Sequence, residues 1–246
     1  MTLPTAESLE GTRLPDLTFR FREGAAWVDR TTADLFAGKR VVAFSLPGAF
    51  TPTCSSSHVP RYDELADAFA DAGIDDLVVV SVNDPFVMEA WEQDQGTTRV
   101  TYLPDGNGEL TEALGMLVDK SDLRFGKRSW RYAMVVNDGV VEKAFIEADV
   151  PGDPFEVSDA DTVLGWLRPD ARAMDVVMVG REGCSHCARA RQLLDDAGIA
   201  YEEIASSPRR LRALSGRVTT PQIFVNGEHI GGADDLTEWL RAASAA

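Results

Sequence analysis

The chain has 246 residues, of which 44% are hydrophobic and 26% charged, and its formal net charge at pH 7 is −16. This balance is typical of a globular protein with a core of normal size, and the acidic excess argues against a nucleic-acid or anionic-membrane partner, since both bind basic surfaces. No run approaches the ~20 apolar residues of a membrane span, and the N-terminus lacks the basic and apolar regions of a secretory signal, so we expect a cytoplasmic protein.

The first predicted segment, residues 1–167, alternates strands with helices. Two β-branched runs, 40–46 and 76–83, have the composition of buried strands. Between them apolar residues recur at helical spacing, and Gly73 ends the predicted helix. These apolar residues are Val59, Tyr62, Leu65, Ala66 and Phe69.

A second helix is predicted over residues 84–94. Asp84 is a suitable N-cap, because a short polar side chain there accepts hydrogen bonds from free helix amides, and Pro85 suits the first helical position. Phe86 and Trp91 lie at helical spacing, and we expect both to pack in the core.

The end of the first segment predicts a hairpin and one more helix. The hairpin covers residues 132–147, with Asp138-Gly139 in its turn. A capped helix follows at 158–167. The polar, proline-containing stretch 168–173 is the predicted linker.

A second segment, 174–246, restarts the pattern as strand, helix, strand, helix, strand, helix. Small domains of about this size fold alone. The predicted elements are 175–180, 185–198, 200–205, 208–216, 221–227 and 234–244. The whole chain is therefore predicted to be an α/β protein of two domains.

A Cys-x-x-Cys pair, Cys184 and Cys187, follows a predicted strand and opens a predicted helix. This is the context of a thioredoxin-like redox motif. Free N–H groups and the helix dipole stabilise an anion at a helix N-terminus, so we expect the Cys184 pKa to fall below the roughly 8.5 of a free cysteine. Cys187, one turn inside the helix, can attack a disulfide formed on Cys184.

Two other interpretations of this pair are weaker. Half of a zinc site would need a second ligand pair, and only His186 and His229 lie nearby. A pair of buried structural cysteines is disfavoured because Gly183 and the strand-to-helix turn place Cys184 at the surface.

The region 174–246 resembles glutaredoxin. The resemblance depends on the cysteine pair, on Thr220-Pro221 and on Gly-Gly-x-Asp at 231–234, which occur in the family's order. It implies a thioredoxin-like fold in which Pro221 is cis and faces the cysteines. It also implies that Thr220 binds the cysteinyl part of glutathione through its backbone.

The same resemblance assigns both ends of glutathione. Gly232, Ala233 and Asp234 would hold the γ-glutamyl end, and Arg181 stands where the family often has a lysine for a glutathione carboxylate. The family's usual Pro-Tyr between the cysteines is replaced here by Ser-His, which bears on redox potential and not on fold.

The third cysteine, Cys54, also lies between a predicted strand and a predicted helix. The next cysteine in the chain is Cys184, so Cys54 has no local dithiol partner. A lone reactive thiolate meets an oxidant or electrophile, and oxidation to a sulfenic acid is the expected chemistry. The alternative is an inert buried cysteine.

The pattern Pro47-x-x-x-Thr51-x-x-Cys54 resembles the signature of the peroxiredoxins, in particular the type II or peroxiredoxin-5 branch. The resemblance implies a second thioredoxin-like fold, in which Pro47 shields the thiolate and Thr51 orients the peroxide. It gives Arg131 the role of a fixed positive charge beside the thiolate, with Arg128 as a weaker supporting candidate.

His58 lies one helical turn after Cys54. A structural hydrogen bond is the favoured role for its imidazole, and a general base is the alternative. The end of the first segment has no resolving cysteine, whereas the second segment supplies a reactive thiol.

Together the two segments resemble the bacterial hybrid peroxiredoxin–glutaredoxin fusions. The resemblance implies glutathione-dependent reduction of hydrogen peroxide and alkyl hydroperoxides, with Cys54 glutathionylated and then recycled by Cys184. It implies no bound cofactor or metal, external glutathione reductase and NADPH, and a homo-oligomer, either a dimer or a tetramer. A general thiol–disulfide oxidoreductase and a peroxide sensor are the alternatives.

Overall fold

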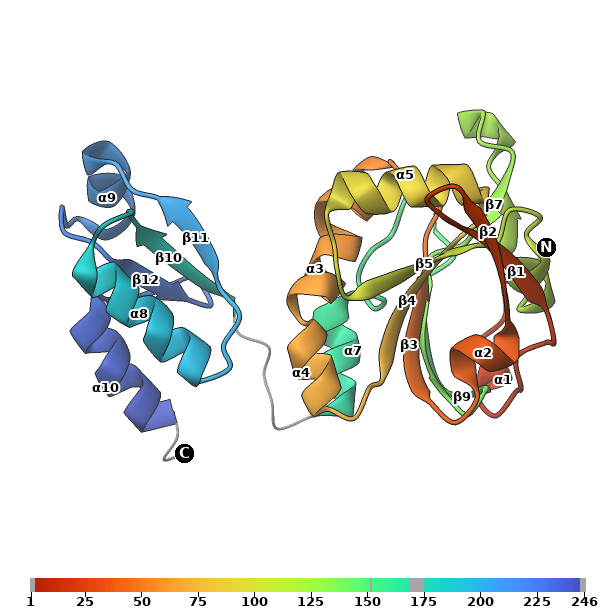
Figure 1. Cartoon of the computed structure of the whole chain (residues 1–246), viewed down its shortest axis with the longest axis horizontal. Coiled ribbons are helices and arrows are strands. Elements are labelled where there is room, and N and C mark those ends of the chain that lie inside the picture. The colour runs from red at the N-terminus through yellow and green to blue at the C-terminus, as the bar shows by residue number, and fades with distance from the viewer. Residues whose placement is uncertain (1–2, 151, 169–174, 244–246) are drawn as a thin grey trace. The chain divides into compact units, whose positions relative to one another are not determined.

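The chain divides into two units, residues 1–171 and 172–246 (Figure 1). The structure is a computed structural model that describes residues 3–150, 152–168 and 175–243. Of the predicted linker at 168–173, only Arg168 lies within these ranges. No helix in the described ranges is both long and apolar enough to cross a bilayer.

The first unit is built on a five-stranded mixed sheet. The strands of the whole unit, in chain order, are β1 (Thr18–Glu23), β2 (Ala26–Thr31), β3 (Arg40–Ser45), β4 (Asp76–Ser81), β5 (Val100–Pro104), β6 (Leu117–Asp119), β7 (Lys127–Ser129), β8 (Tyr132–Asn137) and β9 (Val140–Ile146). The sheet has the order β5-β4-β3-β8-β9, and β1–β2 and β6–β7 form separate pairs. β3, β4 and β5 are parallel, whereas β8 and β9 are antiparallel to their neighbours.

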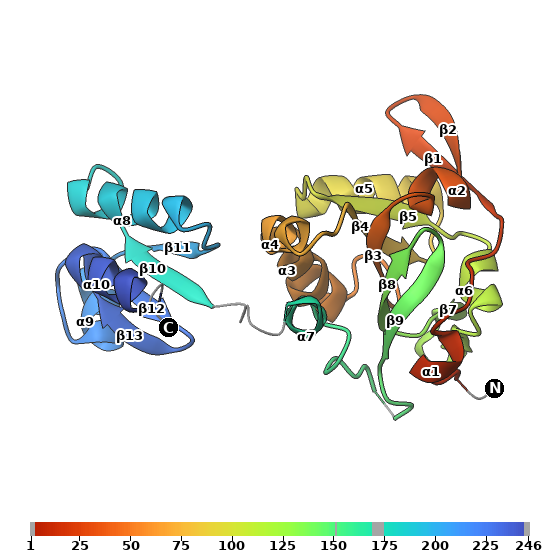
Figure 2. The same ribbon diagram turned by 90° about the horizontal axis from the view of Figure 1, so that it is seen from below.

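Helices cover both faces of this sheet. They are α1 (Ala6–Leu9), α2 (Thr32–Phe36), the π-helix η1 (Cys54–His58), α3 (Val59–Glu64), α4 (Ala66–Asp71), α5 (Pro85–Gln95), α6 (Glu109–Ala113), the 3-10 helix η2 (Ser121–Leu123) and α7 (Ala160–Leu167). Figure 2 shows α3, α4 and α7 on one side of the sheet and α1 and α6 on the other.

Alternation along the central strand divides the core between the two faces, because successive side chains of a strand point to opposite sides. Val41 and Ala43 belong to the apolar cluster with α1, β1 and α6. Phe44 faces the other way, and its ring stacks on that of Tyr62 in α3 at 3.9 Å between centroids.

The two predicted central strands and the predicted hairpin are confirmed. Asp138 and Gly139 connect β8 to β9 with φ angles of 47° and 74°, the left-handed pair that a two-residue hairpin turn requires. The predicted cap of α5 is also present, since the Asp84 carboxylate accepts hydrogen bonds from the amides of Phe86 and Val87.

The helix predicted after Cys54 is broken into pieces. A π-turn occupies Cys54–His58, in which the Val59 amide donates to the Cys54 carbonyl, and a second break at Leu65 separates α3 from α4. Pro60 has no N–H for the carbonyl four residues before it, so regular α-helical bonding is interrupted there.

The prediction that Phe86 is a core residue is wrong. Its side chain is 56% exposed, whereas that of Trp91 on the same helix is fully buried, as predicted. The rings of Phe86 and Trp27 instead pack nearly perpendicular to each other with their centroids 5.3 Å apart, and the Arg22 guanidinium carbon lies 4.7 Å from the Phe86 ring centroid. Helical spacing shows which way a side chain points, but the Phe86 side chain points toward the β1–β2 hairpin, which leaves it exposed.

The second unit is a four-stranded sheet with helices on it. Its elements are β10 (Val176–Gly180), α8 (Ser185–Asp196), β11 (Glu202–Ala205), α9 (Pro208–Ser215), β12 (Gln222–Val225), β13 (Glu228–Gly231) and α10 (Ala233–Ala243). The strand order is β11-β10-β12-β13, with β10 and β11 parallel. Both units are thus of the thioredoxin-like α/β type, as the sequence predicted, with β13 added as the second strand of a hairpin.

Candidate active site

Cys54 lies directly after the loop that follows β3, and its side chain is fully buried. Asn83, which follows β4, fixes this loop: its side-chain oxygen accepts from the Ala49 amide at 3.0 Å and from the Ser81 hydroxyl at 2.7 Å. The loop turns sharply at Phe50, whose φ is 60°. The sequence did not single out Asn83, because its contact with the loop joins residues that are far apart in the chain.

Two of the predicted partners of Cys54 belong to its own loop, and the third comes from just before β8. The Thr51 hydroxyl donates to the Gly48 carbonyl at 2.8 Å, so its oxygen lone pairs stay free to accept a hydrogen bond. Pro47 is half-buried at the start of the same loop. Arg131, immediately before β8, is 1% exposed, and its Nη2 lies 3.6 Å from the Cys54 sulfur.

Arg128 has a different place. Its Nη1 donates to the Val82 carbonyl at 3.0 Å, and its Nε lies within 3.7 Å of the position a Cβ would take at Gly48. We therefore expect Arg128 to support the loop, whereas Arg131 faces the sulfur.

His58 hydrogen bonds through both ring nitrogens. Nδ1 lies 2.9 Å from Nη1 of Arg131, and Nε2 lies 3.1 Å from the Ser158 carbonyl. Because a guanidinium only donates, Nδ1 must accept and Nε2 must carry the proton. Burial and the Arg131 charge lower the pKa of His58 to about 3. Its basic lone pair is already used, which favours the structural role over that of a general base.

Opposing effects act on the Cys54 thiol. Burial raises its pKa, since a thiolate loses its hydration. The Arg131 charge has the largest lowering effect on the pKa, the neighbouring Thr51 hydroxyl and the Arg131 N–H add to it, and the nearby Asp153 carboxylate raises the pKa again. The net direction is upward, so the Cys54 thiolate depends on its fixed neighbours.

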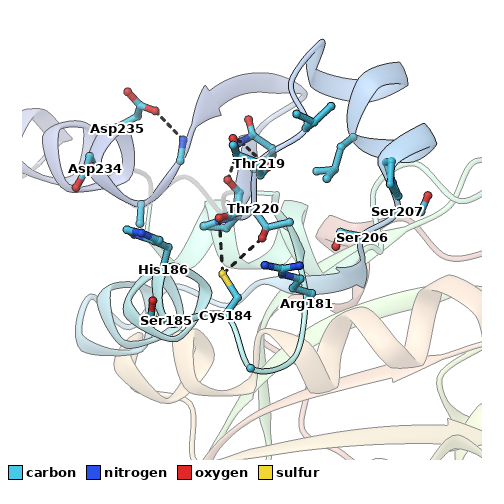
Figure 3. Close-up of a pocket in the computed structure, with 18 residues that line it drawn as sticks. Arg181, Cys184, Ser185, His186, Ser206, Ser207, Thr219, Thr220, Asp234 and Asp235 are labelled. Carbon is cyan, nitrogen blue, oxygen red and sulfur yellow. Dashed lines mark hydrogen bonds between the residues drawn. The ribbon is translucent and has the colours of Figure 1, made fainter.

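Cys184 stands at the N-cap of α8, after β10, in a more open setting (Figure 3). Its sulfur accepts from the Cys187 amide at 3.3 Å and lies 3.5 Å from the Thr220 hydroxyl. Partial burial raises the pKa of Cys184, but hydrogen bonds from the Cys187 thiol, from Thr220 and from the first amides of the helix lower it to about 6. Cys187 is buried, and burial raises its pKa.

Thr220 is presented by a turn that a buried amide side chain holds. The Thr220-Pro221 peptide is cis, as expected. Gln222 donates to the carbonyls of Thr219 at 3.0 Å and Pro221 at 2.8 Å, and its oxygen lies 2.8 Å from Nε2 of His229. No motif in the sequence marks this role of Gln222. His229 is thereby engaged away from the cysteines.

A groove of about 720 Å³ opens beside Cys184. It is lined by Arg181, Thr220, Pro221, Gly232, Ala233 and Asp234, the residues predicted to bind glutathione, and also by Ser206, Ser207, Thr219 and Asp235, which were not predicted. Figure 3 shows Arg181 on one side of Cys184, with Asp234 and Asp235 beyond His186 on the other. A charged group thus lies on each side of the sulfur.

The acidic end of the groove already has internal partners. Asp235 accepts from the Gly232 amide at 2.6 Å, and Asp234 pairs with Arg189 at 2.5 Å. Within the described ranges no group of three or more His, Cys, Asp or Glu side chains has a metal-binding arrangement.

The two units define a class: a thioredoxin-like unit with a lone buried cysteine beside an arginine, followed by one with a Cys-x-x-Cys whose first cysteine reaches the surface. Family comparisons give the same division, since the Redoxin family matches residues 9–164 and the Glutaredoxin family residues 176–230. The chain is 56% identical over 238 residues to "Hybrid peroxiredoxin hyPrx5" of Haemophilus influenzae, covering 95% of this chain and 99% of that one.

Solved structures resemble the first unit. Reduced Prx3 of Vibrio vulnificus in complex with hydrogen peroxide is 43% identical with a TM-score of 0.61, covering 64% of this chain and 98% of that one. The 1-Cys peroxiredoxin of Plasmodium falciparum is 31% identical with a TM-score of 0.63, covering 65% and 99%. The chain therefore belongs to the hybrid peroxiredoxins, peroxide-reducing oxidoreductases that carry a glutaredoxin domain.

Proposed function

We propose that the chain is a glutathione-dependent peroxidase in which Cys54 reduces the hydroperoxide and Cys184 recycles Cys54. The observation that carries this proposal is the pair of unlike thiols: a buried sulfur 3.6 Å from a guanidinium nitrogen, and a half-buried sulfur with a pKa of about 6 beside a groove. The buried Cys54 sulfur suits reaction with a small peroxide, and the more accessible Cys184 sulfur suits exchange with a larger thiol.

The first step is attack of the Cys54 thiolate on one peroxide oxygen. The S–O bond forms as the O–O bond breaks, Cys54 becomes a sulfenic acid, and the departing oxygen takes a proton to leave as water or an alcohol. Arg131 stabilises the negative charge that develops on the departing oxygen. The free lone pairs of the Thr51 hydroxyl suit acceptance of the peroxide O–H.

Glutathione then condenses with the sulfenic acid, which releases water and leaves Cys54 in a mixed disulfide with glutathione. The Cys184 thiolate attacks the glutathione sulfur and frees the Cys54 thiolate. A second glutathione attacks the Cys184 mixed disulfide and leaves as glutathione disulfide. Two glutathione molecules thus supply the two electrons that the peroxide takes up.

The groove supports glutathione as the reductant. Glutathione carries carboxylates at both ends and an ammonium group at its γ-glutamyl end. The groove offers Arg181 on one side of the sulfur and, on the other, the exposed carboxylate of Asp234, one oxygen of which pairs with Arg189. A low-pKa thiol such as Cys184 is also a good leaving group for the second glutathione.

The test is consumption of hydrogen peroxide and of an alkyl hydroperoxide by the full chain with glutathione, glutathione reductase and NADPH. Turnover that requires all three reductant components supports the proposal. A general thiol–disulfide oxidoreductase would reduce mixed disulfides without consuming peroxide. A peroxide sensor would be oxidised once and would then turn over slowly.

The route between the two thiols can be tested by mixing. A C54S chain and a C184S chain each lack one thiol. If glutathione-supported peroxidase activity returns when they are combined, the glutathionyl group passes between chains. If it does not return, each chain serves its own Cys54.

We also propose that the chain forms a dimer or tetramer in the cytoplasm. Trp27 and Phe86 of the first unit are 51% and 56% exposed and pack against each other, and a contiguous exposed apolar surface suits an interface. Sedimentation analysis of the full chain tests this, with F86S expected to shift the equilibrium toward the monomer.

A further inference from the structure

The Arg131 guanidinium is shared between the Cys54 sulfur and a carboxylate. Nη2 lies 3.6 Å from the sulfur and donates to both oxygens of Asp153, at 2.7 and 2.5 Å. Nη1 is used by His58, and the Phe155 ring centre lies 5.2 Å from the guanidinium carbon. The arginine is only 1% exposed, whereas the Asp153 side chain is 43% exposed. The same nitrogen therefore serves the thiol and a carboxylate that reaches solvent.

The connection that carries Asp153 is well anchored. The amides of residues 156, 157 and 158, which follow Asp153, and the Ser158 hydroxyl all donate to the carboxylate of Glu147, which precedes it. Pro154 follows Asp153 directly and restricts the backbone conformation of the residue before it. The carboxylate is thus held in place by the fold and is not a loose surface charge.

We propose that Asp153 is a positioning residue of the peroxide site: its carboxylate fixes the Arg131 guanidinium, and its negative charge limits how strongly that guanidinium stabilises the Cys54 thiolate. The inference rests on the proposed role of Cys54 as the peroxide-reducing thiol.

Three ionisable side chains from three separate segments face the site around Cys54. They are His58 of η1, Arg131 before β8 and Asp153 of the connection after β9. His58 is neutral, because its pKa is about 3, and Glu147 is occupied by the amides of its own connection. The balance of charge at Cys54 is therefore set by one cation and one anion, which act on the Cys54 pKa in opposite directions.

The carboxylate has two effects that two substitutions separate. D153N keeps an oxygen that can accept from Nη2 but removes the charge. D153A removes both. In D153N we expect the pKa of Cys54 to fall, because Arg131 then acts on the thiolate without an opposing charge. In D153A we expect loss of the fixed arginine as well, which slows the peroxide step even where Cys54 is fully ionised.

The measurement uses the full-length chain with Cys184 and Cys187 replaced by Ser, so that Cys54 is the thiol titrated. The rate of alkylation by iodoacetamide across pH reports the Cys54 pKa without peroxide, and stopped-flow oxidation by hydrogen peroxide reports catalysis. At a pH below the midpoint, D153N is expected to alkylate about threefold faster or more. At high pH, D153A is expected to react with peroxide more slowly than both D153N and the parent chain.

D149N is the matched control, because Asp149 is an exposed carboxylate of the same connection and its loss changes the net charge equally. It is expected to leave both profiles unchanged. An unchanged or raised Cys54 midpoint in D153N would overturn the proposal, and so would an equal shift in D149N. If the alkylation profile shifts as expected but peroxide does not oxidise Cys54, the proposed function is wrong, whereas the effect of the Asp153 charge on Cys54 is supported.

Discussion

The two candidate thiols occupy equivalent places in related folds, yet they are made reactive in different ways. Cys54 and Cys184 each follow a strand and begin a helical segment. Cys54 is fully buried and its thiolate depends on one fixed charge, Arg131, against the cost of desolvation. Cys184 reaches solvent and gains its low pKa from hydrogen bonds at the start of α8.

This difference matches the size and chemistry of the reaction partner proposed for each thiol. A buried sulfur beside a guanidinium admits a small oxidant and places a positive charge where an oxyanion develops. An accessible sulfur beside a groove admits a tripeptide thiol and exchanges with it. The fold is reused, and the chemistry is set by burial and by the source of anion stabilisation.

The largest expected effect is that of C54S, which should separate peroxide reduction by the first unit from disulfide reduction by the second. C54S should abolish peroxide consumption, because Cys54 is the cysteine beside Arg131 and Thr51. The same variant should still reduce a glutathione mixed disulfide of 2-mercaptoethanol, which needs only the second unit. Both rates are read from NADPH oxidation with glutathione reductase. Peroxide turnover by C54S above a few per cent of the parent rate would contradict the assignment.

Removing the fixed charge should have the next largest effect. R131M is expected to slow oxidation of Cys54 by roughly 10²–10³-fold, the usual cost of a lost group at a developing oxyanion. Stopped-flow measurement of the single oxidation step isolates this effect from recycling. R128M is the control, since Arg128 donates to the Val82 carbonyl. If R128M is the slower variant, the arginine facing the sulfur has been wrongly assigned.

The second site can be dissected through its two cysteines. C184S should remove most glutathione-supported peroxidase activity, because the low-pKa thiol at the start of α8 is lost. C187S should keep the larger part of it, since Cys187 is buried and glutathione can open the Cys184 mixed disulfide directly. Steady-state NADPH oxidation at matched enzyme concentration compares them. Equal inactivity of both variants would show that a Cys184–Cys187 disulfide is obligatory.

The parts of these sites that the sequence predicted are those with local signals. Pro47, Thr51 and Cys54 lie within one short loop, and Cys184 and Cys187 lie within one helical turn. The β-branched runs predicted the strands, Asp84 predicted the start of α5, and Asp138-Gly139 predicted the hairpin turn. Such signals are reliable because caps and tight turns are decided by neighbouring residues. Arg131 was reached only through family resemblance, since nothing in its own neighbourhood marks it.

What the sequence did not predict comes from contacts between distant segments. Asp153 meets Arg131 only because the connection after β9 folds back beside β8, and Asn83 meets Ala49 because β3 and β4 are neighbours. Phe86 was wrongly placed in the core for a related reason. Periodicity shows which face of a helix a residue occupies, but the covering of that face depends on the rest of the fold.

The smallest expected effect is a difference in titration between the two thiols, measured by alkylation with iodoacetamide across pH. The thiolate is the reactive form, so each rate rises as pH rises through the pKa of that cysteine. In a chain with Cys54 alone replaced by Ser, Cys184 keeps the Cys187 thiol as a hydrogen-bond donor, and its alkylation rate should reach half its maximum at about pH 6. In a chain with Cys184 and Cys187 replaced, the Cys54 midpoint should lie higher, because burial raises its pKa more than Arg131 lowers it. Adding R131M should move the Cys54 midpoint further upward and leave that of Cys184 unchanged. A Cys54 midpoint below that of Cys184 would show that the guanidinium outweighs desolvation in this site.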